Sequence, residues 1–143
     1  MPVYLDTSAL AKWYLNEDLS EEVEAFLGES LPVNISILTK LEMRSLLARR
    51  RREGSIDALT EGRAFSVFEG DITGGHLILL PQRVEHFLLA ESLIGALPGI
   101  PLRSLDALHL GVIQGEGVRA LATADRVMAQ AAGALGLECH TFF

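Results

Sequence analysis

Four acidic residues that lie far apart in the chain occupy positions suited to chemistry: Asp6, Glu42, Asp106 and Asp125. Asp6 and Asp125 each follow a short apolar run, whereas Glu42 and Asp106 lie within apolar helical patterns. If the four carboxylates meet, each raises the pKa of the others and the fold is destabilised unless a cation is bound. An all-oxygen acidic set suits Mg²⁺, with Mn²⁺ as a substitute, rather than zinc. Such a site activates water and holds phosphate oxygens for in-line displacement.

Two of these acids also have structural explanations. Glu42 lies four residues after Leu38 and four before Leu46, at one edge of an apolar helical stripe, where its stem could pack with the carboxylate in water. Asp106 precedes a helical segment that is apolar nearly all round and is therefore expected to be buried. Its place in the first helical turn suits the helix dipole, but this does not explain the apolar surroundings.

The elements that must position these acids alternate along the chain. Strands separated by helices predict an α/β fold with a parallel sheet covered on both faces. In such sheets ligands bind beyond the carboxyl ends of the strands, where Asp6 and Asp125 are expected. The expected strands are residues 3–5, 32–36, 77–81, 120–122 and 137–142. The expected helices are residues 9–15, 20–27, 38–53, 56–69, 84–97, 104–114 and 127–135, with Gly28 ending the second and a loop at 70–75.

Length and composition limit the class of protein. The 143 residues fit one domain over 1–143, and 49% apolar residues suffice for a substantial core. With 12 Lys and Arg against 19 Asp and Glu, the net charge of −7 argues against coating nucleic acid through bulk charge. The single Cys139 excludes an internal disulfide. With no signal peptide and no apolar stretch that spans a bilayer, we expect a soluble cytoplasmic protein without membrane contact.

Basic residues and histidines give weaker signals. Arg49 heads a run of four arginines on the helix that carries Glu42, and Lys40 and Arg44 extend it; the run either holds RNA phosphates or complements the helix dipole. Arg103, three residues before Asp106, is a further candidate for contact with that acid or with substrate. His109 is expected to pack in the core, with a hydrogen bond to a carboxylate as the alternative. The other histidines lack metal-ligand spacing, and Gly115–Ala120 has a dinucleotide-type glycine pattern in the wrong helix–strand order.

The four acids lie in segments that resemble the motifs of one family. Val3-Tyr4-Leu5-Asp6-Thr7-Ser8-Ala9-Leu10 resembles the opening of the PIN-domain nucleases. Leu38-Thr39-Lys40-Leu41-Glu42-Met43-Arg44-Ser45 resembles their second acidic motif, Arg103–Leu110 the third and Leu121–Asp125 the fourth. The order runs across essentially the whole chain and is most similar to the VapC toxins of type II toxin–antitoxin systems.

This resemblance implies a three-layer α/β/α sandwich and a Mg²⁺-dependent endoribonuclease. It implies that Asp6 and Asp106 bind metal directly, and that Glu42 and Asp125 bind it directly or through water. Thr7, Ser8 and Thr123 would orient carboxylates or water. It further implies an RNA substrate, a small VapB-like antitoxin whose C-terminal segment covers the site, and a toxin homodimer. Two rival hypotheses remain, a housekeeping PIN ribonuclease without antitoxin and a catalytically silent PIN-like module that binds RNA or protein.

Overall fold

The five strands form one parallel sheet with the order β3-β2-β1-β4-β5 in the computed structural model, which describes residues 2–143. The strands are β1 (Val3–Leu5), β2 (Val33–Ser36), β3 (Leu77–Leu80), β4 (Ala120–Thr123) and β5 (Glu138–Thr141). The helices are α1 (Thr7–Tyr14), α2 (Ser20–Ser30), α3 (Ile37–Arg52), α4 (Ala58–Thr73), α5 (Val84–Ala96), α6 (Ser104–Gly115) and α7 (Arg126–Ala134).

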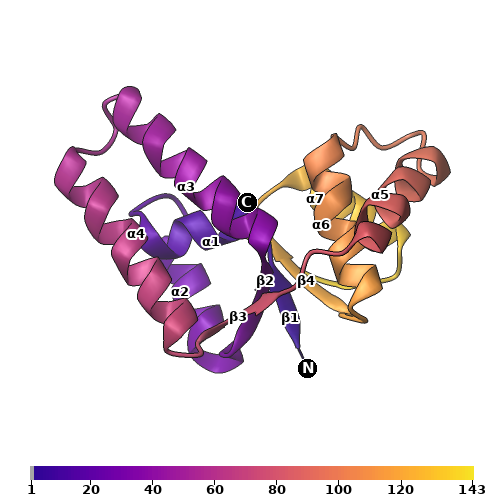
Figure 1. Ribbon diagram of the computed structural model, residues 1–143, viewed down its shortest axis with the longest axis horizontal. Helices are drawn as coiled ribbons and strands as arrows, with labels where there is room; N and C mark the ends of the chain where they lie inside the picture. The colour runs from indigo at the N-terminus through magenta and orange to yellow at the C-terminus, as the bar shows by residue number, and fades with distance from the viewer. Residues whose placement is uncertain (1) are drawn as a thin grey trace.

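The helices cover both faces of the sheet, which confirms the three-layer α/β/α prediction. Figure 1 shows α1–α4 gathered on one side and α5–α7 on the other. Alternation along β1 explains this arrangement, because successive strand residues point to opposite faces. Val3 and Leu5 belong to the core cluster formed with α1–α4, whereas Tyr4 belongs to the cluster formed with α5–α7. All three side chains are buried, as expected for a central parallel strand.

Side chains at the ends of strands start three of the helices. Asp6 caps α1 by accepting from the Ala9 amide, and Asp125 caps α7 by accepting from the Val127 and Met128 amides. Ser36 caps α3 in a reciprocal capping box with Thr39. Since Asp6 is the cap, α1 begins at Thr7, two residues before the predicted start. Two of the four candidate acids are therefore fixed in place by helix caps.

Two helices extend past the glycines at which the sequence predicts their ends. The predicted stop at Gly28 is wrong, since α2 continues to Ser30 and the following Leu31 packs against the core. The predicted loop at 70–75 is also wrong, since α4 continues to Thr73. There Ile72 packs against the same core, and Asp71 accepts a 2.6 Å hydrogen bond from the Tyr14 hydroxyl. Tertiary contacts in both places outweigh the loss of helix propensity at glycine, which is about 1 kcal/mol.

The helices are short compared with a bilayer. The longest, α3 and α4, have 16 residues each, whereas a spanning helix needs roughly 20 apolar residues. Within residues 2–143, no helix has both the length and the apolar character needed to cross a membrane.

Candidate active site

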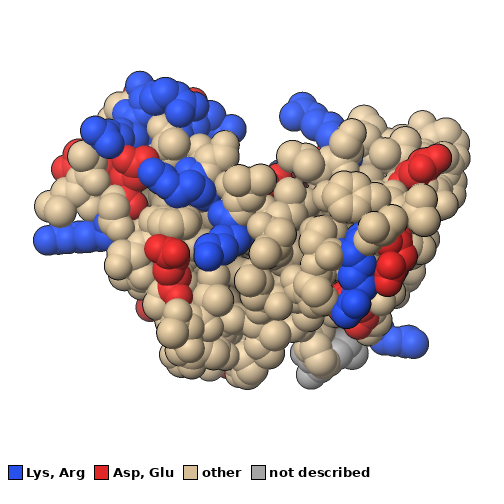
Figure 2. Space-filling model, viewed as in Figure 1, with Lys and Arg blue, Asp and Glu red and all other residues tan. Residues whose placement is uncertain are grey.

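The four candidate acids line one cavity of about 670 Å³ at the carboxyl ends of the strands. Asp6 follows β1 and Asp125 follows β4, while Glu42 and Asp106 enter from α3 and α6. Figure 2 shows the surface hollowed between the half built from α1–α4 and the half built from α5–α7, with Lys and Arg side chains gathered over the distal end of α3. The topology thus brings together acids separated by up to 119 positions in the sequence, from 6 to 125.

Asp6 is held by hydrogen bonds to both carboxylate oxygens. Oδ1 accepts from the Ser8 hydroxyl at 2.6 Å and from the Ala9 amide at 3.1 Å. Oδ2 accepts from the Thr123 hydroxyl at 2.5 Å, which is possible because Leu5 and Ala122 are paired across β1 and β4. Burial raises the pKa of Asp6, and the hydroxyl donors oppose that rise. The carboxylate is therefore rigid and desolvated, as a group that binds a cation should be.

Glu42 shares one oxygen between two donors. Its Oε1 accepts from the Thr7 hydroxyl at 2.7 Å and lies 2.5 Å from Nε2 of His109. Partial burial raises the pKa of Glu42, but the hydrogen bonds from His109 and Thr7 outweigh it and lower the pKa below the ordinary value. Glu42 is consequently kept as a carboxylate. His109 is buried, as the sequence predicts, and it also makes the carboxylate contact named as the alternative.

His109 connects Glu42 to the polar side chains of strands β1 and β2. Its Nδ1 lies 2.6 Å from the Tyr4 hydroxyl, which lies 2.8 Å from Oγ of Ser36. Burial raises the pKa of Tyr4, so the side chain remains a phenol with a proton to donate. A phenol donating to Nδ1 leaves Nε2–H to donate to Glu42. The hydrogen bonds that connect Ser36, Tyr4 and His109 thereby orient Glu42 from the side of the sheet.

Asp106 and Asp125 complete the acidic wall of the cavity. Asp106 is half-buried, and its Oδ2 accepts from the Arg103 amide at 3.3 Å. Burial raises its pKa, and the negative charges of Asp125 and Glu42 raise it further. Asp125 accepts the two capping bonds of α7, and its own amide donates to the Thr123 hydroxyl at 3.0 Å. Burial is the main cause of the raised pKa of Asp106, and the like-charge repulsion expected when acids share a site adds to it.

Only some of the candidate cations reach this cavity. Arg49 and Arg103 line it. Lys40 instead lies 3.9 Å from Glu69, and Arg44 lies 3.1 Å from Glu61. Both of these acids are on α4, so Lys40 and Arg44 face away from the acids of the cavity.

The donor chemistry of the site fits Mg²⁺. All four acids offer oxygen, the one histidine that lines the cavity has both ring nitrogens engaged by Tyr4 and Glu42, and a divalent cation relieves the mutual repulsion of the acids. In the conformation described for residues 2–143, no three His, Cys, Asp or Glu side chains converge closely enough to hold an ion. The cavity thus contains the type of ligand that Mg²⁺ prefers, and the carboxylates would have to move closer together to bind one ion.

Comparison with known proteins now gives the family. A family model for the PIN domain matches residues 3–134. The chain belongs to the PIN-domain family. It is also 35% identical over 138 residues to Ribonuclease VapC46 of Mycobacterium tuberculosis, covering 94% of this chain and 93% of that one. This full-length likeness places the PIN domain described here in the VapC group.

Solved structures show the same PIN-domain fold. VapC20 of Mycobacterium tuberculosis, described as a sarcin-ricin loop cleaving toxin, superposes with a TM-score of 0.73 at 15% identity, covering 90% of this chain and 94% of that one. VapBC2 of Rickettsia felis, solved with a promoter DNA fragment, superposes with a TM-score of 0.69 at 13% identity over the whole of both chains. At such identities the likeness concerns the fold alone.

Sequence reasoning missed one part of this PIN-domain site, the contribution of Tyr4. In the sequence it is an ordinary residue of a β-rich run, and nothing marks a polar role. A signal was available in hindsight, because a central strand buried on both faces rarely carries a hydroxyl without a partner. That partner, His109, is 105 residues away, so only the fold reveals the contact.

Proposed function

We propose that this PIN-domain protein is a Mg²⁺-dependent endoribonuclease that acts as the toxin of a type II toxin–antitoxin system. The observation that carries the proposal is the convergence of four carboxylates from four separate segments on one cavity, without compensating side-chain cations on Asp6 or Asp106 among the described ion pairs. The full-length relative VapC46 is named a ribonuclease, and VapC20 is described as a toxin that cleaves RNA of the sarcin-ricin loop.

In this proposal Asp6 and Asp106 bind the metal directly, and Glu42 and Asp125 bind it directly or through water. A bound divalent cation would supply Lewis-acid activation of the attacking water and charge neutralisation at the phosphate. Ser8 and Thr123 hold Asp6, while Thr7 and His109 hold Glu42, so neighbouring side chains already orient these two carboxylates.

The substrate in this proposal is RNA, whose phosphates would be held by Arg49 and Arg103 at the rim of the cavity. Lys40 and Arg44 are engaged with acids on α4, so we assign them a lesser part. Water attacks phosphorus in line, the bond from phosphorus to the 3′ oxygen breaks, and the products carry a 5′-phosphate and a 3′-hydroxyl. The compartment that we propose for this activity is the cytoplasm.

The proposed inhibitor is a small VapB-like antitoxin whose C-terminal segment covers the cavity. Support comes from the solved relatives, among which are VapBC2 and the FitAcB structure from Neisseria gonorrhoeae, whose TM-score is 0.69 over 96% of both chains. A segment carrying Lys or Arg would satisfy the acids that a metal otherwise neutralises.

The proposed homodimer would use the exposed apolar side chains at the start of α3 and α5. Leu41 is 69% exposed, Val84 76% and Leu88 59%, and the two helices already share a small core cluster through Leu38 and Ala90. Leu88→Glu should therefore shift the protein toward monomer in sedimentation equilibrium. Leu59→Glu, at an equally exposed leucine on α4, is the matched control.

The deciding experiment is cleavage of total cellular RNA by antitoxin-free protein, with Mg²⁺ and with chelator, followed by mapping of new 5′ ends. Discrete Mg²⁺-dependent ends that are absent with Asp6→Asn support the proposal. No new ends with any divalent metal would favour the silent binding module instead. Cleavage by a chain whose gene has no neighbouring antitoxin gene would favour the housekeeping ribonuclease.

A further inference from the structure

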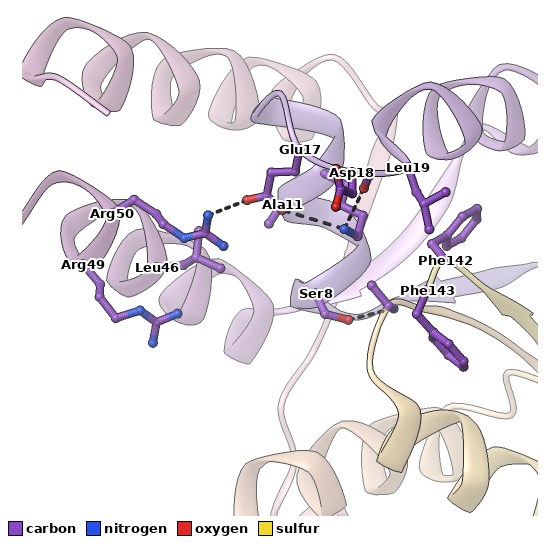
Figure 3. A pocket seen from close by; sticks show the side chains of 12 residues that line it. Ser8, Ala11, Glu17, Asp18, Leu19, Leu46, Arg49, Arg50, Phe142 and Phe143 are labelled. Carbon is purple, nitrogen blue, oxygen red and sulfur yellow. Dashed lines mark hydrogen bonds and ion pairs between the residues drawn. The ribbon is translucent and has the colours of Figure 1, made fainter. Parts of the chain in front are cut away.

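A second cavity, of about 760 Å³, adjoins the acidic one. Ser8, Leu46 and Arg49 line both, so the two form a continuous groove that leads away from the acids. Figure 3 shows its walls, with Leu46 and Arg49 of α3 on one side and the C-terminal Phe143 on the other. The groove therefore starts at the carboxylates and runs between a basic helix and an aromatic ring.

The basic wall offers one cation that is available to an anion. The Arg49 side chain is 55% exposed, and its ion pair with the exposed Glu53 is long, at 4.0 Å, and weak in water. Deeper in the groove, Glu17 lies 2.8 Å from Arg50 and 3.9 Å from Lys12, and all three are largely shielded. Those charges compensate one another, so Arg49 is the cation that an incoming phosphate would meet.

The aromatic wall is held rigidly. The Arg126 guanidinium lies 4.2 Å from the centre of the Phe143 ring, and the ring is 47% exposed. The preceding Phe142 is buried, packs on Phe26 and donates its amide to the Thr123 carbonyl at 3.0 Å. Phe143 thus follows an anchored residue, has a cation over its ring, and remains about half exposed where it lines the groove. Arg126 also follows Asp125 directly, which places this ring beside the acidic cavity.

A cation and a half-exposed aromatic ring that line opposite sides of one groove match a nucleotide, which carries a phosphate and a base. Bases of single-stranded RNA stack on aromatic side chains, whereas bases in a duplex are already stacked. We propose that this groove binds the nucleotide next to the scissile phosphate, with its base on Phe143 and its phosphate on Arg49. The inference rests on the proposed ribonuclease function and adds that the RNA must be unpaired at this position.

The test measures RNA affinity separately from cleavage. In the Asp6→Asn background, binding of a fluorescein-labelled single-stranded RNA of mixed sequence is followed by anisotropy, with the same RNA annealed to its complement as a comparison. Phe143→Ala should weaken binding of the single strand about tenfold, while Phe143→Trp retains it. Arg49→Ala should weaken both and reduce the slope of log affinity against log salt by about one, a slope that Phe143→Ala leaves unchanged.

Matched variants separate this effect from general damage. Leu59→Ala removes a comparably exposed apolar side chain on α4, and Arg119→Ala removes an exposed arginine before β4, at the opposite end of the sheet. Both should bind like the parent. Thermal melts of each variant report folding.

The outcomes separate this inference from the proposed function. If Phe143→Ala and Phe143→Trp both bind RNA like the parent while the unmutated protein still cleaves it, the groove is not a nucleotide subsite and the ribonuclease proposal survives. If Phe143→Ala loses RNA binding but the unmutated protein cleaves with no divalent metal, the groove stands and the proposed function fails. Loss of antitoxin affinity alone in Phe143→Ala would assign the groove to the protein partner and overturn the inference.

Discussion

The molecule contains two buried histidine–glutamate pairs with opposite surroundings. His109 meets Glu42 in the acidic cavity, and His86 of α5 meets Glu116 after α6, with Nε2 and Oε2 2.9 Å apart. In the second pair, Nδ1 of His86 accepts from the Arg83 amide, and the Arg83 side chain lies 3.1 Å from Glu116. The second carboxylate therefore has a cation of its own, whereas Glu42 has further acids as neighbours.

The helices around the second pair are packed to accommodate it. A Cβ at Gly111 would lie 2.3 Å from the His86 carbonyl oxygen, and a Cβ at Gly115 would lie 2.5 Å from the His86 ring. The two glycines on one face of α6 thus let α5 approach closely enough for the contact. The pair serves to join two helices, with its polar groups satisfied and its charge balanced.

The difference shows how to separate function from architecture in this fold. A histidine–carboxylate contact by itself identifies nothing, because both regions have one. What distinguishes the candidate site is that four acids line one cavity, where Asp125 and Glu42 add to the effect of burial in raising the pKa of Asp106.

The largest expected effect is on Asp106. Asp106→Asn should lower RNA cleavage roughly a thousandfold or more, because it removes a proposed ligand, yet leave metal-free stability unchanged or higher because repulsion is relieved. Cleavage assays and melts in chelator measure the two effects. Asp57→Asn, at a helix cap outside the cavity, is the control and should cleave normally. A metal-free Asp106→Asn protein that melts well below the parent would make Asp106 a structural residue.

Gly111→Ala should lower stability and leave RNA cleavage nearly unchanged, the opposite of Asp106→Asn. The added Cβ meets backbone atoms of His86, so α5 must shift, and overpacking of this kind costs about 1–3 kcal/mol of unfolding free energy. Urea denaturation measures the loss, and cleavage per folded molecule should stay near that of the parent. Gly95→Ala on α5, where a Cβ meets nothing within 4 Å, should be neutral or stabilising. Equal stability of the two variants would contradict the packing described for α5 and α6.

Tyr4→Phe tests whether the hydrogen bond from Tyr4 to His109 helps to position Glu42. Loss of the hydroxyl leaves Nδ1 of His109 without its donor, and we expect about a tenfold loss of Mg²⁺ affinity in calorimetry, with a similar loss of activity. Tyr14→Phe removes a hydroxyl bonded to Asp71 outside the cavity and should change stability but not metal affinity. If both variants bind Mg²⁺ like the parent, the Tyr4–His109 contact is architectural.

The smallest expected effects are in the pH dependence of stability. At neutral pH the ionised Glu116 should stabilise the fold, whereas the ionised Asp106 should destabilise it. His86 and Arg83 hold the pKa of Glu116 below its usual value, so this group stabilises the fold at neutral pH and loses that contribution as pH falls through its folded pKa. Burial raises the pKa of Asp106, so its penalty is present at neutral pH and disappears below the unfolded pKa of about 3.9. Melting of metal-free Glu116→Gln should therefore lie below the parent at pH 7, Asp106→Asn at or above it, and both differences should shrink in acid.

Much of the fold could be predicted because hydrophobic patterning is local. The alternation of strands and helices and the parallel sheet follow from neighbouring residues, and the expected starts of α1 and α7 lie within two residues of the observed ones. The errors at Gly28 and Gly70 occur where contacts from distant segments hold a helix together past a weak residue. Local propensity contains no information about such contacts.

The candidate site also has parts that local sequence identifies and parts that only the fold reveals. Each acid is identified by its local context, and the structure brings all four to one cavity, while their role as ligands stays a prediction. The engagement of Arg44 with Glu61 and the contact of Tyr4 with His109 depend on pairs 17 and 105 residues apart. Side-chain partners over such separations follow from topology, which a single sequence does not specify.

The two capping acids have a practical consequence for the choice of inactive variants. Asp6 and Asp125 each close a helix by accepting backbone amides. Asparagine keeps that bond, whereas alanine forfeits it at about 1 kcal/mol. Silenced versions for expression in living hosts are therefore best made as asparagine variants. Under the proposed function, an asparagine at either position would give a protein that still folds but has lost a proposed metal-binding carboxylate.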